Sequence, residues 1–311
     1  MRIAVPMLLV FACSTLLAAP ADRTPPWAEP RHAAELSPEE PDDAGGATPG
    51  GAAAYTRIQR LYKTADGARD GRLVVVYQDA TAHGTVWESR GGTHPARDVL
   101  FRGSDDDGAT WSRPVNLSRS ATLYSAVTDG DGDGVSEPYW GDNGKPVLMA
   151  KGDTVVVAWT SRYVPEPGWS RGQVGVSSLQ GSSVFDVDGV AHEVPYHGVF
   201  VAVSPDGGAT WNHGGEAPAL QLTYGRRDAH FLSQRGQGKR WSLVWQEDPA
   251  GLQPGEAEGP GEGSSGAKTS SGTDIWYAFT ENVVTKAERL AATRTPVSDN
   301  SSYDATATDW V

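Results

Sequence analysis

The sequence predicts an all-β protein made of repeated four-stranded antiparallel sheets, and three observations carry this prediction. Glycine (37), proline (21) and tryptophan (11) are abundant among the 311 residues, a composition that favours short strands joined by turns. The same order of four short apolar segments occurs three times along the chain. A nearly identical glycine-rich octapeptide follows the third segment in the first two copies. We therefore expect little helix outside the N-terminal segment.

The N-terminus has the pattern of an export signal. The first three residues, MRI, supply a basic tip, and the apolar stretch that follows is too short to span a bilayer. Small residues at Ala19 and Ala21 predict cleavage after Ala21, so that residues 1–21 are removed. The alternative is a lipoprotein signal with Cys13 acylated. We expect a bacterial protein that is secreted, periplasmic or exposed on the outer cell surface.

Residues 22–54 are expected to form a disordered spacer, because they are rich in Pro, Ala, Glu and Gly and lack apolar periodicity. Cys13 is the single cysteine of the sequence, so a mature chain that starts at Asp22 has no disulfide. The formal net charge of −13 would repel phosphate backbones and anionic membranes, and we find no basic patch. Nucleic acid is thus excluded as an expected partner, and no transmembrane segment is expected.

The three copies are expected at 55–120, 142–224 and 226–295, followed by a polar tail at 296–311. Their expected strands, in order, are 55–58, 71–79, 98–103 and 115–118 in the first copy, 144–150, 153–162, 198–203 and 220–223 in the second, and 228–234, 239–248, 274–280 and 289–293 in the third. Insertions at 121–141, 163–197 and 249–273 are expected between the second and third strands, on one shared face where ligands bind.

Four antiparallel strands per repeat are the pattern of a β-propeller blade, and a β-sandwich is the alternative. Three blades do not close a ring, because propellers have about four to eight. We expect the missing blades to come from the rest of a longer chain or from a partner.

Two octapeptides, at 104–111 and 204–211, have the pattern S-x-D-x-G-x-T-W. The aspartate can accept hydrogen bonds from its own turn, the glycine permits a positive φ, and the tryptophan can cover the blade. The expected structural residues are Ser104, Asp106, Gly108, Thr110 and Trp111, and Ser204, Asp206, Gly208, Thr210 and Trp211. This motif resembles the Asp box, or BNR repeat, of the sialidase-like β-propellers, which implies a partial six-bladed propeller. Because Asp boxes also occur in secreted propellers that cleave nothing, the motif predicts architecture and not chemistry.

The innermost strand of each blade lines the propeller axis, so cations there are candidate ligand-binding residues. We expect Arg57, Lys145 and Arg227, the last beside Arg226, to occupy comparable places and to hold a carboxylate. The segment YTRIQ around Arg57 is similar to the Tyr-Arg-Ile-Pro motif of sialidases, with Gln59 in place of the proline. The resemblance implies that Arg57 grips the carboxylate of a sialic acid.

The resemblance also implies an acid/base aspartate, for which Asp79 and Asp98 are the candidates, with substrate binding as the alternative role of Asp98. Glu247 is a candidate partner of the tyrosine nucleophile that a sialidase needs, and Tyr277 a candidate for that tyrosine. For both residues, an ordinary structural role in their strands is the favoured alternative. A complete catalytic set of three arginines, a tyrosine and a glutamate cannot be placed.

The segment DGDGDG at 129–134 matches the first six positions of a calcium loop, with Trp140 in place of the last EF-hand ligand. The sequence predicts either a Ca²⁺ site made by Asp129, Asp131, Asp133 and Glu137, or an acidic glycine-rich turn. His192, His197 and His213 fit no zinc-ligand spacing and are expected to be ordinary surface histidines.

Two functions fit these features. The favoured one is a secreted or envelope propeller that binds a carbohydrate or protein ligand as a scaffold. The segments TDIWYAFT and WQEDPAGLQPGEAEGPGEG also resemble secreted bacterial proteins of the choice-of-anchor type, which implies surface anchoring. The alternative is an exo-sialidase or a related glycoside hydrolase. Convergence of the cations on a tyrosine–glutamate pair would distinguish the second function from the first.

Overall fold

The computed structural model describes residues 54–62, 69–87, 93–167, 177–187, 189–248 and 274–298, and the expected signal and spacer lie outside these ranges. The described chain is all-β apart from the short helix α1 (Arg289–Ala292). Its strands are β1 (Ala54–Tyr62), β2 (Arg69–Trp87), β3 (Thr93–Ser104), β4 (Val115–Asn116), β5 (Tyr124–Thr128), β6 (Glu137–Trp140), β7 (Asn143–Lys151), β8 (Thr154–Ser161), β9 (Ser182–Val187), β10 (Val190–Pro195), β11 (Gly198–Ser204), β12 (Leu220–Gln221), β13 (Asp228–Gln237), β14 (Arg240–Asp248), β15 (Asp274–Thr280) and β16 (Thr295–Pro296). Among these residues, no helix is long and apolar enough to cross a membrane.

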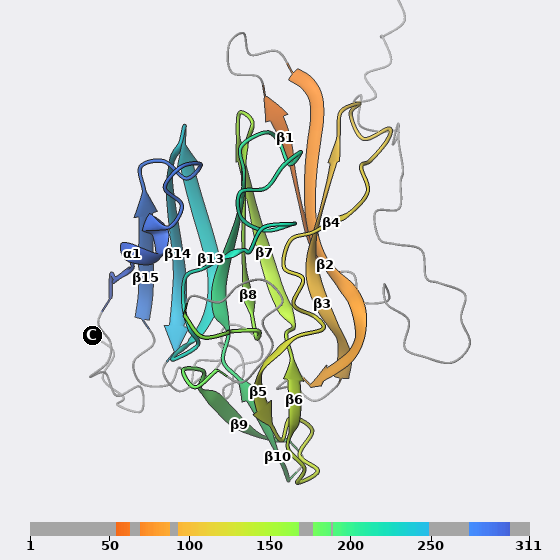
Figure 1. Ribbon diagram of the computed structural model, residues 1–311, viewed down its shortest axis with the longest axis vertical. Coiled ribbons are helices and arrows are strands. Elements are labelled where there is room, and N and C mark those ends of the chain that lie inside the picture. Colours follow the sequence, from red (N-terminus) through yellow and green to blue (C-terminus); the bar gives the residue numbers. More distant parts are fainter. Residues whose placement is uncertain are drawn as a thin grey trace, which may run out of the picture. The chain divides into compact units, whose positions relative to one another are not determined.

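Twelve of these strands form three sheets of four (Figure 1). The strand orders are β1-β2-β3-β4, β7-β8-β11-β12 and β13-β14-β15-β16, and every pairing is antiparallel. Each sheet is an up-and-down meander, as in a propeller blade. The predicted fold class is confirmed.

The second sheet is buried on both faces because it packs between the other two. All eight residues of β8 are buried, and its apolar run TVVVAW is typical of a strand without a solvent face. Val156 and Ala158 join the core shared with the third sheet, whereas Val155 and Val157 join the core shared with the first. Side-chain alternation along one strand therefore builds two cores.

The first two Asp boxes lie in the β3–β4 and β11–β12 turns. In the first, Ser104 Oγ donates to Asp106 Oδ1 (2.8 Å) and accepts the Gly108 amide (2.8 Å). The Thr110 amide and hydroxyl donate to the two oxygens of Asp106 at 2.8 and 2.7 Å. These hydrogen bonds from Thr110 and Ser104 lower the pKa of Asp106 to about 2. Gly108 has a φ of +90°, and Trp111 Nε1 donates to its carbonyl oxygen (3.1 Å).

The second box repeats this network almost atom for atom. Ser204 Oγ donates to Asp206 Oδ1 (2.9 Å) and accepts the Gly208 amide (2.8 Å), and Thr210 donates twice to Asp206. Gly208 has a φ of +98°. Trp211, like its counterpart in the first box, is partly buried rather than fully buried.

The third sheet keeps a remnant of the same turn. Thr280 takes the place of the box serine, because both pair with the first residue of the apolar run in the adjacent strand. The Asn282 amide donates to Thr280 Oγ1 (3.3 Å), as the aspartate amide does to serine in both boxes. The fourth strand expected at 289–293 is instead helix α1, and β16 supplies that strand two residues later.

Two hairpins lie outside the three sheets, β5–β6 and β9–β10, and appear at the lower end of Figure 1. The insertion 163–197 leaves the second sheet between β8 and β11, as expected. The expectation for 121–141 is wrong, since this segment follows β4 and connects the first sheet to the second. The insertion 249–273 lies outside the described residues.

Candidate functional site at the ends opposite the Asp boxes

The three inner strands β1, β7 and β13 share a β-bulge near their N-terminal ends. The register shifts lie between Ala54 and Arg57, between Gly144 and Val147, and between His230 and Ser233. Because the Asp boxes follow the C-terminal ends of β3 and β11, antiparallel pairing places these bulges at the opposite ends of the sheets.

Each bulge begins with a non-glycine residue in the left-handed region. The residues are Tyr55 (φ +49°), Lys145 (φ +46°) and Phe231 (φ +51°). Large L-residues reach this region only at a cost, about 1–2 kcal/mol each, and such strain is concentrated at functional sites. Three sheets therefore repeat the same strained position with three bulky side chains.

These three side chains converge. Lys145 Nζ lies 5.8 Å from the centroid of the Tyr55 ring and 5.3 Å from that of Phe231, within the range of cation–π attraction. All three residues are exposed, Tyr55 to 45 % and Phe231 to 49 %. The buried Gln78 fixes the central bulge, because its Oε1 accepts the Lys145 amide (2.9 Å). The arrangement is a cation between two aromatic faces open to solvent.

The expected equivalence of the three cations is wrong. Arg57 is the first paired residue after its bulge and therefore corresponds to Val147 and Ser233, not to Lys145 or Arg227. Its guanidinium is exposed and donates to the Thr56 carbonyl oxygen (3.0 Å). Comparison by charge alone misaligned the copies, because the register places Lys145 inside its bulge, Arg57 after its bulge and Arg227 before its bulge.

Gln59, which replaces the proline of the sialidase motif, links two sheets. Its Nε2 donates to the Ala150 carbonyl oxygen (3.2 Å) and its Oε1 accepts the Ala150 amide (2.6 Å). A proline in this place could make neither bond. The departure from the motif thus has a structural reason.

Asp98 is a hydrogen-bond hub and faces Asp79 across β2 and β3. It is 3 % exposed and accepts hydrogen bonds from β2, from the segment that follows it in the first sheet, and from β7 of the second sheet. The donors are Thr81 Oγ1, Asn116 Nδ2, Ser118 Oγ, the Ser120 and Ala121 amides and Asn143 Nδ2. Asp79 is fully buried and accepts the Ala80 amide (2.9 Å). This geometry favours a structural role for Asp98, while catalysis by either residue stays a prediction.

The structure brings Arg227 and Glu247 together with Asp274, a residue that the sequence did not single out. Arg227 Nη2 donates to Asp274 Oδ2 (2.8 Å), and its Nε lies 3.6 Å from Glu247 Oε2. Trp245 Nε1 donates to Glu247 Oε1 (2.8 Å). Burial raises the pKa of Glu247 despite these partners. Arg226 is exposed beside this cluster.

Tyr277 does not join this group. It pairs with Val244 on β14, and its hydroxyl lies 3.2 Å from Ser242 Oγ, further along the strand. Among the described residues, the cations do not meet at a tyrosine–glutamate pair.

A histidine–aspartate–histidine cluster lies where the second sheet meets the third. His197 Nδ1 is 2.7 Å from Asp228 Oδ1, and His230 Nε2 is 2.8 Å from Asp228 Oδ2. All three residues are buried. Burial and the charge of Arg162 lower the pKa of His197 to about 3, so this imidazole is neutral at physiological pH. Burial alone would raise the pKa of Asp228, but the two histidines hold it well below its usual range.

The expectation that His192 and His197 lie at the surface is therefore wrong, since each is 8 % exposed. His192 stacks on Trp87 with ring centroids 3.7 Å apart, whereas His213 is only partly buried. No local spacing reveals the cluster, because its members come from different sheets. The sequence offered one clue, the i, i+2 spacing of Asp228 and His230, which places both on one face of a strand.

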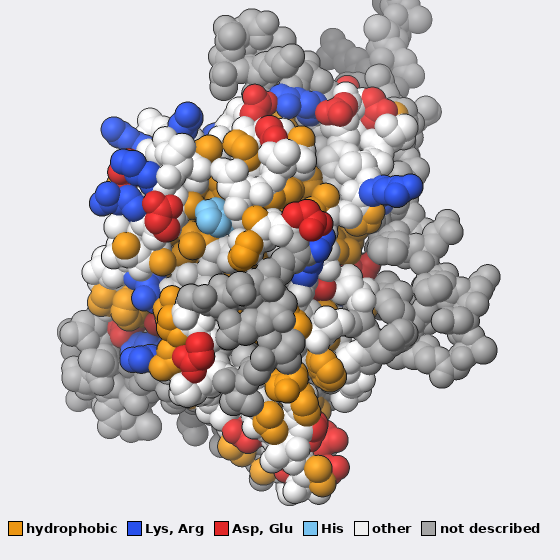
Figure 2. Space-filling model, in the orientation of Figure 1, with side chains coloured by type: hydrophobic (Ala, Val, Ile, Leu, Met, Phe, Trp, Pro, Cys, Tyr) orange, Lys and Arg blue, Asp and Glu red, His pale blue; other side chains and the backbone are white. Residues whose placement is uncertain are grey.

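The acidic loop at 129–134 lies between β5 and β6, and Figure 2 shows acidic side chains gathered at that lower end of the molecule. Carboxylate oxygens of Asp129, Asp131 and Asp133 lie within 4.8 Å of one another. Asp129 Oδ1 is buried and has no hydrogen-bond partner among the described residues. Burial and the three neighbouring aspartates raise the pKa of Glu137. Oxygen donors in this arrangement fit Ca²⁺, and binding stays a prediction.

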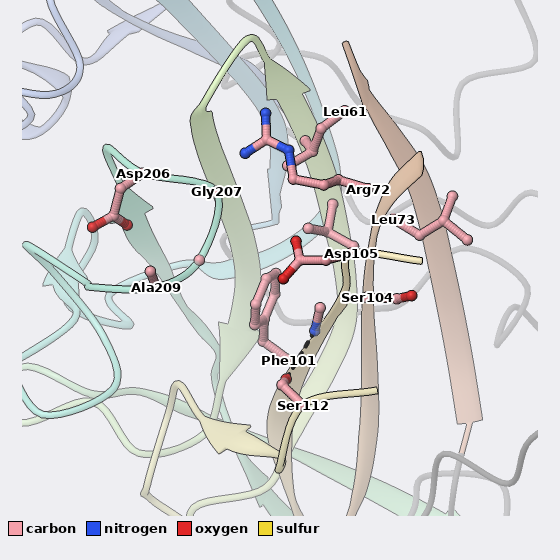
Figure 3. A pocket seen from close by; sticks show the side chains of 13 residues that line it. Leu61, Arg72, Leu73, Phe101, Ser104, Asp105, Ser112, Asp206, Gly207 and Ala209 are labelled. Atoms are coloured by element: carbon pink, nitrogen blue, oxygen red, sulfur yellow. Dashed lines mark hydrogen bonds between the residues drawn. The ribbon is translucent and has the colours of Figure 1, made fainter. Parts of the chain in front are cut away.

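A cavity of about 250 Å³ lies between the first two Asp boxes (Figure 3). Its lining includes Phe101, Asp105, Asp206 and Arg72, which donates to Asp153 Oδ1 (2.8 Å). It lies at the end of the sheets that holds the boxes, away from the bulges. No residue predicted for ligand binding or catalysis lines it.

Comparison with known proteins gives only distant structural matches. No protein-family model and no curated protein matches the chain. Among solved structures, a GH93 α-L-arabinofuranosidase of Fusarium graminearum, in complex with arabinobiose, is 8 % identical with a TM-score of 0.38, over 83 % of this chain and 52 % of that one. An α-L-arabinanase of Penicillium chrysogenum complexed with arabinobiose is 11 % identical with a TM-score of 0.36, over 78 % and 49 %. The chain spans about half the length of these structures.

Proposed function

We propose that this chain is part of a secreted or envelope Asp-box propeller that binds a carbohydrate ligand at the inner-strand bulges. The observation that carries the proposal is the cation between two exposed rings formed by Lys145, Tyr55 and Phe231. The C–H-rich face of a sugar ring packs on an aromatic face, and an ammonium group attracts a carboxylate. An acidic sugar such as a sialic acid would use both interactions.

The bulge geometry supports this proposal beyond the residue types. The three left-handed residues are strained, and the free chain gains nothing evident from that strain. A ligand that contacts all three side chains would compensate for it. The exposed Arg57 and Arg226, which lie at the same ends of the sheets, add positive charge to an otherwise acidic protein. Local charge of this kind favours an anionic ligand over a neutral one.

The test is a titration of the folded chain with 3′-sialyllactose, with lactose as the neutral ligand that lacks the carboxylate, followed by NMR and calorimetry. We expect binding of 3′-sialyllactose to weaken about tenfold in Lys145→Met, which corresponds to about 1.4 kcal/mol. Phe231→Ala should weaken the binding of both 3′-sialyllactose and lactose. Lys151→Met is the matched control, because Lys151 is an exposed lysine at the other end of β7. Equal binding by wild type and Lys145→Met would contradict a role of the ammonium group.

A second candidate, glycoside hydrolysis, is favoured by one observation. Burial raises the pKa of Glu247, which pairs with Asp274 on the adjacent strand, and a glycosidase pairs a protonated carboxylic acid with an ionised carboxylate. Hydrolysis of a fluorogenic sialoside by wild type that is lost in Glu247→Gln and in Arg57→Ala would establish this activity. No turnover by a folded chain that still binds 3′-sialyllactose would leave the binding function alone.

A further inference from the structure

The cluster of His197, Asp228 and His230 borders the carbohydrate site, since His230 directly precedes Phe231, and it has the composition of a metal centre. One imidazole nitrogen from each histidine and one carboxylate oxygen of Asp228 lie within 4.8 Å of one another. Two imidazoles and a carboxylate are the donors of many Zn²⁺ sites, whereas Ca²⁺ prefers oxygen donors throughout. The donor set therefore selects for zinc over calcium.

The surrounding structure positions these donors before any ion binds. Asp228 and His230 lie two residues apart on β13, so their side chains share one face of the strand. His197 comes from the residue before β11, and its own amide donates to Asp228 Oδ1 (2.7 Å). This hydrogen bond from the His197 amide orients the Asp228 carboxylate, as hydrogen bonds to the ligands do in known metal sites.

Arg162, whose charge acts on His197, is engaged elsewhere. Arg162 lowers the pKa of His197, but its guanidinium donates to the Pro195 carbonyl oxygen and stacks over the Tyr139 ring, 5.5 Å from the centroid. The side chains of His197, Asp228 and His230 retain 11 %, 4 % and 7 % of their exposure. A bound ion would thus be largely shielded from solvent.

We propose that His197, Asp228 and His230 form a zinc site that joins the second sheet to the third. Three protein donors leave one position of a tetrahedral ion for water or a ligand group. The ion would replace the two short histidine–aspartate contacts and would add a cross-link that neither sheet has alone. The competing state is a metal-free hydrogen-bonded cluster with the same three residues.

The experiment is a Zn²⁺ titration of the chelator-treated full chain, followed by metal analysis after gel filtration. We expect one zinc per chain, and a loss of affinity of about a hundredfold or more in His230→Gln and Asp228→Asn, since even outer-shell changes cost about 10–100-fold. His213→Gln is the matched control, because His213 is a partly buried histidine away from the cluster. Asp131→Asn controls for binding in the acidic loop.

Circular dichroism and tryptophan fluorescence show whether each variant folds. If a variant does not fold, the Co²⁺-loaded wild-type chain decides, because tetrahedral Co²⁺ with nitrogen and oxygen donors gives much stronger d–d bands than six-coordinate Co²⁺. Strong bands that Zn²⁺ abolishes support the site. Weak bands, no retained zinc in wild type, or equal retention by both cluster variants would overturn it and leave the hydrogen-bonded cluster.

Discussion

Trp211 meets Phe101 edge to face across the junction of the first two sheets, with ring centroids 5.0 Å apart and ring planes at 77°. Trp211 closes the second Asp box, whereas Phe101 lies on β3 of the first sheet, and both belong to the shared core. Gly208 of the same box faces the same ring, because a Cβ built on it would lie 2.2 Å from Phe101 Cζ. The box is thus part of the packing between sheets as well as a turn.

Gly208→Ala should lower the free energy of unfolding by about 2–5 kcal/mol. A positive φ costs an L-residue about 1–2 kcal/mol, and the added methyl group overpacks the Phe101 ring for about 1–3 kcal/mol more. Gly134→Ala is the matched control, because Gly134 also has a positive φ but a Cβ there meets nothing within 4 Å. Urea unfolding measures both variants, and equal losses would show that packing against Phe101 contributes nothing.

Gln59→Leu should cost about 1–3 kcal/mol of unfolding free energy. The change removes both bonds to Ala150 and leaves a partly buried amide and carbonyl without partners, which is the expensive way to lose a hydrogen bond. Gln237→Leu, on an exposed residue of β13, is the control. If both variants unfold at the same urea concentration, the link between β1 and β7 does not stabilise the chain.

The sheets could be predicted because their signals are local. An Asp box carries its own hydrogen bonds within eight residues, so Ser104 to Trp111 reveal the turn without knowledge of the rest of the chain. The continuous apolar run TVVVAW likewise identifies β8 as a strand. An eroded turn is expected before 289–293 in the third copy, but Thr280 and Asn282 could not be identified in it, because they form similar turn hydrogen bonds with other residue types.

The candidate sites could not be predicted in the same way because they depend on register between distant segments. Tyr55, Lys145 and Phe231 each lie in a bulge and have a positive φ, but they are three different residue types. Sequence comparison of the three copies therefore cannot align them. His197 approaches Asp228 only when β11 and β13 pack in adjacent sheets. Arg227 and Glu247 were predicted by residue type, whereas Asp274 becomes visible only through pairing of β14 with β15.

Glu247→Gln should make the chain more stable near neutral pH. Because burial raises the pKa of Glu247 in the folded state above its usual value of 4.5, folding favours the protonated acid. Stability is therefore highest below the unfolded pKa, and it falls as the pH rises through the raised folded pKa. Glutamine keeps an acceptor for Trp245 Nε1 and cannot ionise.

Urea unfolding of wild type and Glu247→Gln between about pH 4 and pH 8 measures this effect. The two curves should meet at the acidic end, and the variant should be the more stable at the neutral end. Glu288→Gln, on an exposed glutamate, is the control. A variant that is less stable than wild type at neutral pH would show that attraction between Glu247 and Arg227 outweighs desolvation.

Calcium should raise the melting temperature of the chain through the loop that holds Asp129, Asp131 and Asp133. The three carboxylates converge, and a buried oxygen of Asp129 has no partner among the described residues, so a hard cation would offset both repulsion and desolvation. An ion present at about 100 times its dissociation constant adds about 2.7 kcal/mol of stability.

Scanning calorimetry with Ca²⁺ and with a chelator measures this shift of the melting temperature. It should vanish in Asp131→Asn and persist in Asp105→Asn, an exposed carboxylate of the first Asp box. A shift of equal size in wild type and Asp131→Asn would place any bound calcium outside this loop.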